Sequence, residues 1–160
     1  MTLKPEPLKT DLIGGKTLKT DEKVEFFGQV DELSAHIMEV THYIDDVQTE
    51  MELRKIVNLL STMMGEVAGG FGHIGEKHLS ELLEVIAKYE ELAGPFKGFV
   101  VPGTTLMGAR FHILRTITRR AERAYARVFE KYGGSEYIFE YLNKMSTLFY
   151  AIARTYDEKE

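Results

Sequence analysis

The sequence has no cysteine, no long apolar run and little sign of a targeting segment. The absence of cysteine excludes disulfides, thiolate nucleophiles and every metal or iron–sulfur site that needs a cysteine ligand. No apolar run approaches the roughly 18 residues of a membrane-spanning helix, and the start, MTLKPEPLKTDLIGG, lacks the apolar core of a secretory signal. We therefore expect a cytoplasmic protein without a membrane partner, stabilised by the packing of its core.

The composition is that of one globular domain. Of the 160 residues, 44% are apolar and 28% are charged, which is enough to bury a sizeable core. The formal net charge is −5, so the molecule as a whole repels nucleic acid and anionic membranes. We expect neither as a partner.

Apolar residues recur at helical spacing along most of the chain. The pattern predicts helices over 22–44, 49–70 and 76–94, a fourth from the threonines at 104–105 to Gly133-Gly134, and a fifth over about 135–157. Strand-like sequence is limited to GFVV at 98–101. The predicted fold is therefore an all-α, up-and-down five-helix bundle over residues 21–160, preceded by an extended arm over 1–20.

The same periodicity predicts which side chains face the core. The expected core residues are Phe26, Val30, Leu33 and Ile37 in the first helix; Leu53, Val57, Leu60 and Met64 in the second; Leu82, Ile86 and Leu92 in the third; Ile113, Ile117, Ala121, Ala124 and Val128 in the fourth; and Ile138, Leu142, Met145, Phe149 and Ile152 in the fifth.

The fourth helix, which contains FHILRTITRRAERAYARVFEKY, is unusually basic. Six of the chain's eight arginines and a single glutamate lie between residues 110 and 127, in a protein whose net charge is negative. A basic patch in an acidic protein favours a compact polyanion, such as a triphosphate, over a long nucleic acid. Salt bridges to an acidic neighbouring helix or subunit are the alternative, because charge runs usually form solvated faces.

Three polar residues of this helix share a stripe. At 100° per residue, Arg115, Arg119 and Glu122 lie roughly 200° from the expected core stripe. Guanidinium groups one turn apart can clamp phosphate oxygens, and a nearby glutamate can orient them or help to hold hydrated Mg²⁺. The same spacing also occurs in ordinary surface pairs, so the stripe alone does not decide between these readings.

Three segments of the sequence resemble the PduO-type ATP:cob(I)alamin adenosyltransferases. They are FVVPGTTLMGARFHILRTITRRAER at 99–123, YLNKMSTLFYAIAR at 141–154 and KTDEKVEFFGQVDELSAHI at 19–37. The first carries the family's Pro-Gly turn and its arginine-rich helix, the second its Leu-Asn motif, and the third its lysine nine residues ahead of a glycine. The resemblance spans about residues 10–155, in the same order.

The resemblance implies a homotrimer of five-helix bundles with active sites between subunits, and ATP, Mg²⁺ and cobalamin as cofactor and substrates. It implies catalytic roles for Arg119 and Glu122, with Glu122 also at the metal; ATP binding by Lys19, Arg119, Asn143 and Thr10; corrinoid binding by Phe99 below the ring; and a salt bridge between subunits from Arg115 to Asp31. A cobalamin reductase or an adenosylcobalamin-dependent enzyme is implied as a further partner.

Some positions depart from the family's pattern. The glycine-rich Thr-Gly-Asp-x-Gly stretch that should precede TDLIGG is replaced by LKPEPLK, Lys144 replaces an arginine, and Thr147 replaces an aspartate. Two functions therefore stay open. The first is an ATP:corrinoid adenosyltransferase that transfers the 5′-deoxyadenosyl group to Co(I) and releases triphosphate. The second is a catalytically degenerate relative that acts as a corrinoid- or nucleotide-binding carrier or scaffold.

Overall fold

The computed structural model describes residues 7–96, 98 and 101–157, and it contains five long helices after a short hairpin. The elements are β1 (Lys9–Leu12), β2 (Gly15–Leu18), α1 (Glu22–Thr41), α2 (Val47–Val67), α3 (Glu76–Ala93), α4 (Leu106–Tyr132) and α5 (Glu136–Asp157). The predicted five-helix bundle is confirmed. Within the described ranges, no helix has both the length and the apolar character needed to span a bilayer.

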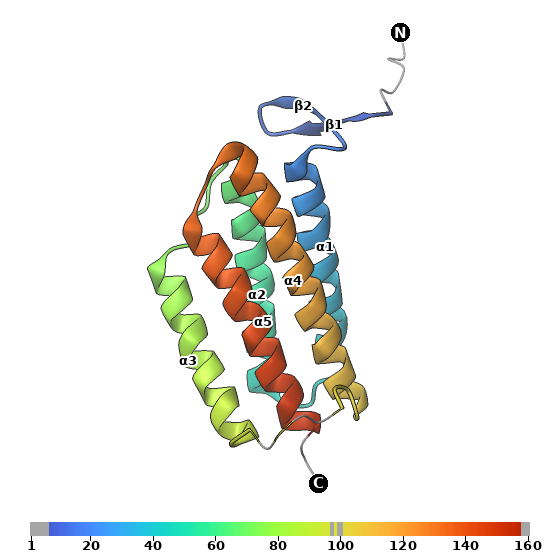
Figure 1. Ribbon diagram of the computed structural model, residues 1–160, viewed down its shortest axis with the longest axis vertical. Coiled ribbons are helices and arrows are strands. Elements are labelled where there is room, and N and C mark those ends of the chain that lie inside the picture. Colours follow the sequence, from blue (N-terminus) through green and yellow to red (C-terminus); the bar gives the residue numbers. More distant parts are fainter. Residues whose placement is uncertain (1–6, 97, 99–100, 158–160) are drawn as a thin grey trace.

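Consecutive helices run in opposite directions, and the hairpin lies at the end of the bundle where α1 begins (Figure 1). α4 packs between α1 and α5, while α5 also packs on α3 and α1 also packs on α2. The two helices that carry most of the expected site, α4 and α5, are therefore direct neighbours.

The helix ends follow the local chemistry of the sequence. Asp21 caps α1 by accepting from the Lys23 N–H at 2.8 Å, and Thr105 caps α4 by accepting from the Gly108 N–H at 3.0 Å. The third and fourth helices end at Gly94 (φ 80°) and Gly133 (φ 73°), where other residues would be strained. Both glycine stops and the threonine cap were predicted.

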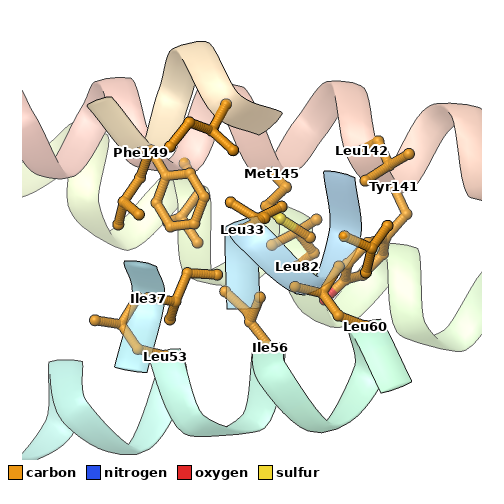
Figure 2. Close-up of a cluster of buried hydrophobic side chains, with 14 of the residues drawn as sticks. Leu33, Ile37, Leu53, Ile56, Leu60, Leu82, Tyr141, Leu142, Met145 and Phe149 are labelled. Atoms are coloured by element: carbon orange, nitrogen blue, oxygen red, sulfur yellow. The ribbon is translucent and has the colours of Figure 1, made fainter. Parts of the chain in front are cut away.

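The core lies along the bundle axis, where side chains of α1, α2, α3 and α5 meet. Figure 2 shows this cluster with Leu33, Ile37, Leu53, Ile56, Leu60, Leu82, Tyr141, Leu142, Met145 and Phe149. All the core residues predicted for α1 and α5 are buried. In α2, Ile56 and Met63 are buried, whereas Val57 and Met64 are only partly covered.

Two core predictions were wrong. Ile113 is 49% exposed because α4 must face both α1 and α5, and this centres its buried side on Leu114, Thr118 and Ala121. Leu92 is 65% exposed because Tyr89 fills the last inward position of α3.

The hairpin was not predicted. β1 and β2 pair antiparallel from Lys9 opposite Leu18 to Leu12 opposite Gly15, and the turn uses Gly14 at φ 96°. The hairpin is joined to the bundle through Asp21, whose N–H donates to the Leu18 carbonyl at 2.9 Å. Residues 9–18 therefore form an ordered ladder, which the Gly14-Gly15 pair makes sterically possible.

Candidate functional site

The polar stripe of α4 lies at the surface, with one buried oxygen beneath it. Arg119 is exposed, while Arg115 and Glu122 are half-buried. The Oε2 atom of Glu122 is fully buried and has no hydrogen-bond partner among the described residues. A buried carboxylate oxygen without a hydrogen bond costs free energy, so this atom is a candidate to bind a cation or a hydrogen-bond donor that lies outside the described residues.

Arg115 makes its described hydrogen bond to a residue of its own helix, α4. Its Nε–H donates to Nδ1 of His112 at 3.3 Å, and Nε2 of His112 lies 3.1 Å from Oδ2 of Asp157 at the end of α5. Burial raises the pKa of the Asp157 carboxyl, but hydrogen bonds from Gly103, Thr105 and His112 outweigh it and hold this pKa below its usual value. The sequence analysis did not identify Asp157.

The expected partner of Arg115 lies elsewhere in the chain. Asp31 is exposed on α1, and no described residue pairs with it. Next to it, Arg120 crosses from α4 to α1, where its Nε donates to Gln29 at 2.7 Å and its Nη2 to Glu32 at 2.7 Å. Arg120 therefore forms the salt bridge to a neighbouring helix that the sequence left open as an alternative. Arg115 and Asp31 form no ion pair with each other within one chain.

Lys19 lines a surface hollow of about 470 Å³ between the hairpin end and α4. The residues around it are Lys19, Thr20, Glu22, Glu25, Ala124 and Arg127. Arg127 is eight residues beyond Arg119, or about 12 Å along the helix axis at 1.5 Å per residue. A single chain therefore places Lys19 near Arg127 instead of Arg119.

The remaining candidates lie on three other segments. Thr10 is in β1, opposite Thr17 of β2, and Asn143 is exposed on α5. The hydroxyl of Thr147 donates to the Asn143 carbonyl at 3.4 Å, so it is used within α5 and supplies no negative charge. Phe99 lies outside the described residues.

The model of the cobalamin adenosyltransferase family matches residues 8–156 of this chain. The chain is 29% identical over 153 residues to the corrinoid adenosyltransferase of Citrobacter freundii, covering 91% of this chain and 87% of the relative. It is 32% identical over 154 residues to that of Bacillus subtilis (strain 168), covering 91% and 80%.

Solved structures agree with the sequence matches. A variant PduO-type ATP:corrinoid adenosyltransferase from Lactobacillus reuteri, complexed with cobalamin and ATP, superposes with a TM-score of 0.86 at 27% identity, covering 94% of this chain and 87% of that chain. A second variant from the same organism, complexed with ATP, gives 0.86 at 29% identity, with coverages of 94% and 90%. The chain belongs to the cobalamin adenosyltransferase family.

Proposed function

We propose that this protein is an ATP:corrinoid adenosyltransferase, which transfers the 5′-deoxyadenosyl group of ATP to Co(I) of a corrinoid such as cobalamin. The observation that carries the proposal is the polar stripe of α4, where an exposed Arg119 stands one turn from the buried, unpartnered Oε2 of Glu122. A free cationic fork beside an unsatisfied carboxylate suits a phosphate chain with a divalent cation.

The residues present fit Mg²⁺ better than a cation that needs a full protein cage. Among the described residues, no three histidine or acidic side chains gather as a metal site. Mg²⁺ commonly binds through one or two carboxylates together with substrate phosphates and water, and Glu122 supplies one carboxylate. When bound, the ion would neutralise charge on the phosphates of ATP.

The reaction makes modest demands on the protein. Co(I) is a strong nucleophile, so the Co–C5′ bond forms while the C5′–O bond breaks, and the electron pair leaves with the triphosphate. No covalent enzyme intermediate or general base is required. The chain has to align C5′ with cobalt and stabilise the departing charge, and we assign the latter role to Arg119 with Lys19, and nucleotide binding to Thr10 and Asn143 as well.

We further propose that the site forms between subunits of a homotrimer. Within one chain, Lys19 shares a hollow with Arg127, which lies about two helical turns along α4 from Arg119, and Asp31 is exposed with no ion pair to a described residue. A second copy would bring an arm to the Arg119 stripe and pair Asp31 with Arg115. We place the protein in the cytoplasm, where a reductase would supply Co(I) and an adenosylcobalamin-dependent enzyme would use the product.

The test uses the purified 160-residue protein with chemically reduced cob(I)alamin and Mg-ATP. We expect the absorption spectrum to change to that of a light-sensitive Co–C product, with one triphosphate released per corrinoid, and sedimentation to give a trimer. Binding of both substrates without turnover would contradict the enzyme and favour the carrier alternative, to which the altered arm residues point. A wild-type monomer at micromolar concentration would contradict the shared site.

A further inference from the structure

The last turn of α5 holds both ends of the connector between α3 and α4, residues 94–105. At the first end, Nη2 of Arg154 donates to the Gly94 carbonyl at 2.9 Å, and its guanidinium lies 5.9 Å from the centroid of the Phe96 ring. At the second end, Asp157 accepts from the Gly103 N–H at 2.8 Å. Two charged residues three positions apart on one helix thus hold the start and the end of the same connector.

The carboxylate of Asp157 accepts an unusually large number of hydrogen bonds. Its Oδ1 faces the Thr105 N–H and hydroxyl, both at 3.2 Å, and the Thr104 hydroxyl at 3.4 Å, while its Oδ2 faces Gly103 and His112. Only 5% of its side chain is exposed. A buried carboxylate that accepts several hydrogen bonds fixes the groups around it, because releasing any one of them leaves charge unsatisfied.

Close backbone packing leaves room for this carboxylate. A Cβ at position 108 would overlap the Asp157 carboxyl group, so any other residue there would displace this carboxylate from its hydrogen bonds. Gly103 has φ +83°, a conformation that other residues rarely adopt, and its N–H points to Oδ2 of Asp157. The turn before α4 is therefore shaped around the end of α5.

The same carboxylate also sets the orientation of Arg115. Because the Arg115 Nε–H donates to Nδ1 of His112, Nδ1 must be an acceptor, and the ring proton is then on Nε2, where it donates to Asp157. The imidazole is 13% exposed and packs in a T-shaped arrangement with the ring of Tyr150, with the ring centroids 6.1 Å apart. Asp157 thus links the end of the connector, at Gly103, to Arg115 in the polar stripe of α4, through the Nε2–H tautomer of His112.

We infer that Arg154 and Asp157 are positioning residues, which hold the described ends of the connector, at Gly94 and at residues 103–105, together with Arg115, in the geometry needed to bind the corrinoid substrate. The inference rests on the proposed function, because the resemblance implies corrinoid contact by Phe99, a residue within this connector. The inference itself is carried by the connector's described ends at Gly94, Gly103 and Thr105. Fixing both ends before the substrate arrives lowers the ordering cost of binding.

The test compares Asp157→Ala, Asp157→Asn and Arg154→Gln with a matched control, Thr155→Ala. Thr155 is in the same turn of α5, and its hydroxyl donates to the Ile152 carbonyl of its own helix at 2.6 Å. Circular dichroism first establishes that each variant is folded. Hydrogen exchange then measures the exchange rates of the Gly103 and Thr105 amides. Titration with cob(II)alamin measures the corrinoid affinity, and steady-state kinetics give the KM values for corrinoid and for ATP separately.

For Asp157→Ala we expect both amides to exchange at least about tenfold faster, and the KM and Kd for corrinoid to rise at least about tenfold, with the KM for ATP changed less than about twofold. Asp157→Asn should be intermediate, because an amide keeps one acceptor and turns an NH₂ group toward the other donors. Arg154→Gln should weaken corrinoid binding in the same direction, and Thr155→Ala should leave every value unchanged.

Several results would overturn the inference. If the Gly103 and Thr105 amides of Asp157→Ala exchange at the wild-type rate, the carboxylate does not hold the turn. If they exchange faster but the corrinoid affinity is unchanged, the turn does not position the substrate. An equal rise in the KM for ATP, or equal losses in Thr155→Ala, would indicate general damage. A wild type that binds cob(II)alamin but does not transfer the adenosyl group contradicts the proposed activity alone, because exchange and titration still decide the positioning role.

Discussion

Replacing Asp21 with alanine should lower the free energy of unfolding by about 2–3 kcal/mol. The carboxylate is buried at the start of α1, where it caps the helix at the Lys23 N–H (2.8 Å) and accepts from the Tyr132 hydroxyl of α4 (2.5 Å). Loss of an N-cap costs about 1 kcal/mol, and loss of a hydrogen bond to a charged acceptor costs about 1.5 kcal/mol or more. The exposed Lys131 at 3.1 Å adds little, because water screens the pair.

The matched control is Asp46→Ala. Asp46 caps α2 at the Gln48 N–H (3.2 Å) and also accepts from the Thr49 hydroxyl of the same helix, but it is exposed and makes no described hydrogen bond to another helix. Its replacement should cost about 1 kcal/mol, the ordinary value for a cap. Urea unfolding at pH 7, followed by circular dichroism, measures both. Equal losses in the two variants would refute the contribution of the α1–α4 contact.

Acidification should reduce the difference between wild type and Asp21→Ala. Burial raises the pKa of Asp21, but the bonds from Tyr132, Lys23 and Lys131 outweigh it and hold this pKa below the usual 3.8. A depressed folded-state pKa means that the stabilisation is fully present above the unfolded value and is lost as the pH falls through the folded value. The difference should therefore be constant near neutrality and decline below about pH 4. A difference that grows on acidification would contradict the assigned contacts.

Three further changes test the site and its support. Arg119→Ala should lower the adenosylation rate roughly hundredfold, whereas Arg123→Ala, an exposed arginine one turn on, should change it less than about threefold; equal losses would indicate a diffuse charge effect. Glu122→Gln should raise the Mg²⁺ concentration for half-maximal activity roughly tenfold, and an unchanged Mg²⁺ titration would contradict metal contact. Gly108→Ala should destabilise the fold by about 2 kcal/mol in urea despite alanine's helix propensity, because its Cβ would displace Asp157; a neutral result would contradict that packing.

Helical periodicity predicted the bundle well because most helices bury a single stripe. α1 and α5 follow it at every predicted position. It failed at Ile113 because α4 contacts two helices, so its buried face is wider than one stripe and is centred on a different line. It missed the hairpin because strands of four residues are too short to show alternation, although the Gly14-Gly15 pair is an ordinary turn signal.

The hydrogen bonds that position the site residues were harder to predict from the sequence. Asp157 and Gly103 are 54 positions apart, and their hydrogen bond follows from how α5 ends beside the start of α4. No spacing rule relates them. The one available signal was His112, which precedes Arg115 by three residues and so must lie on the same side of α4. The structure shows that this histidine is largely buried, and that the acceptor for its ring N–H comes from α5.

The separation of Lys19 from Arg119 decides how the proposed site is to be tested. If both residues act on one triphosphate, a trimer made only of Arg119→Ala chains lacks a complete site, and so does a trimer made only of Lys19→Ala chains. Mixed trimers of Lys19→Ala and Arg119→Ala chains should then recover activity, because some interfaces combine an intact arm with an intact stripe. If the two residues act within one chain, beside the hollow that Lys19 shares with Arg127, mixing would restore nothing. Complementation, measured after denaturing and refolding the two variants together, therefore distinguishes a shared site from a site within one chain.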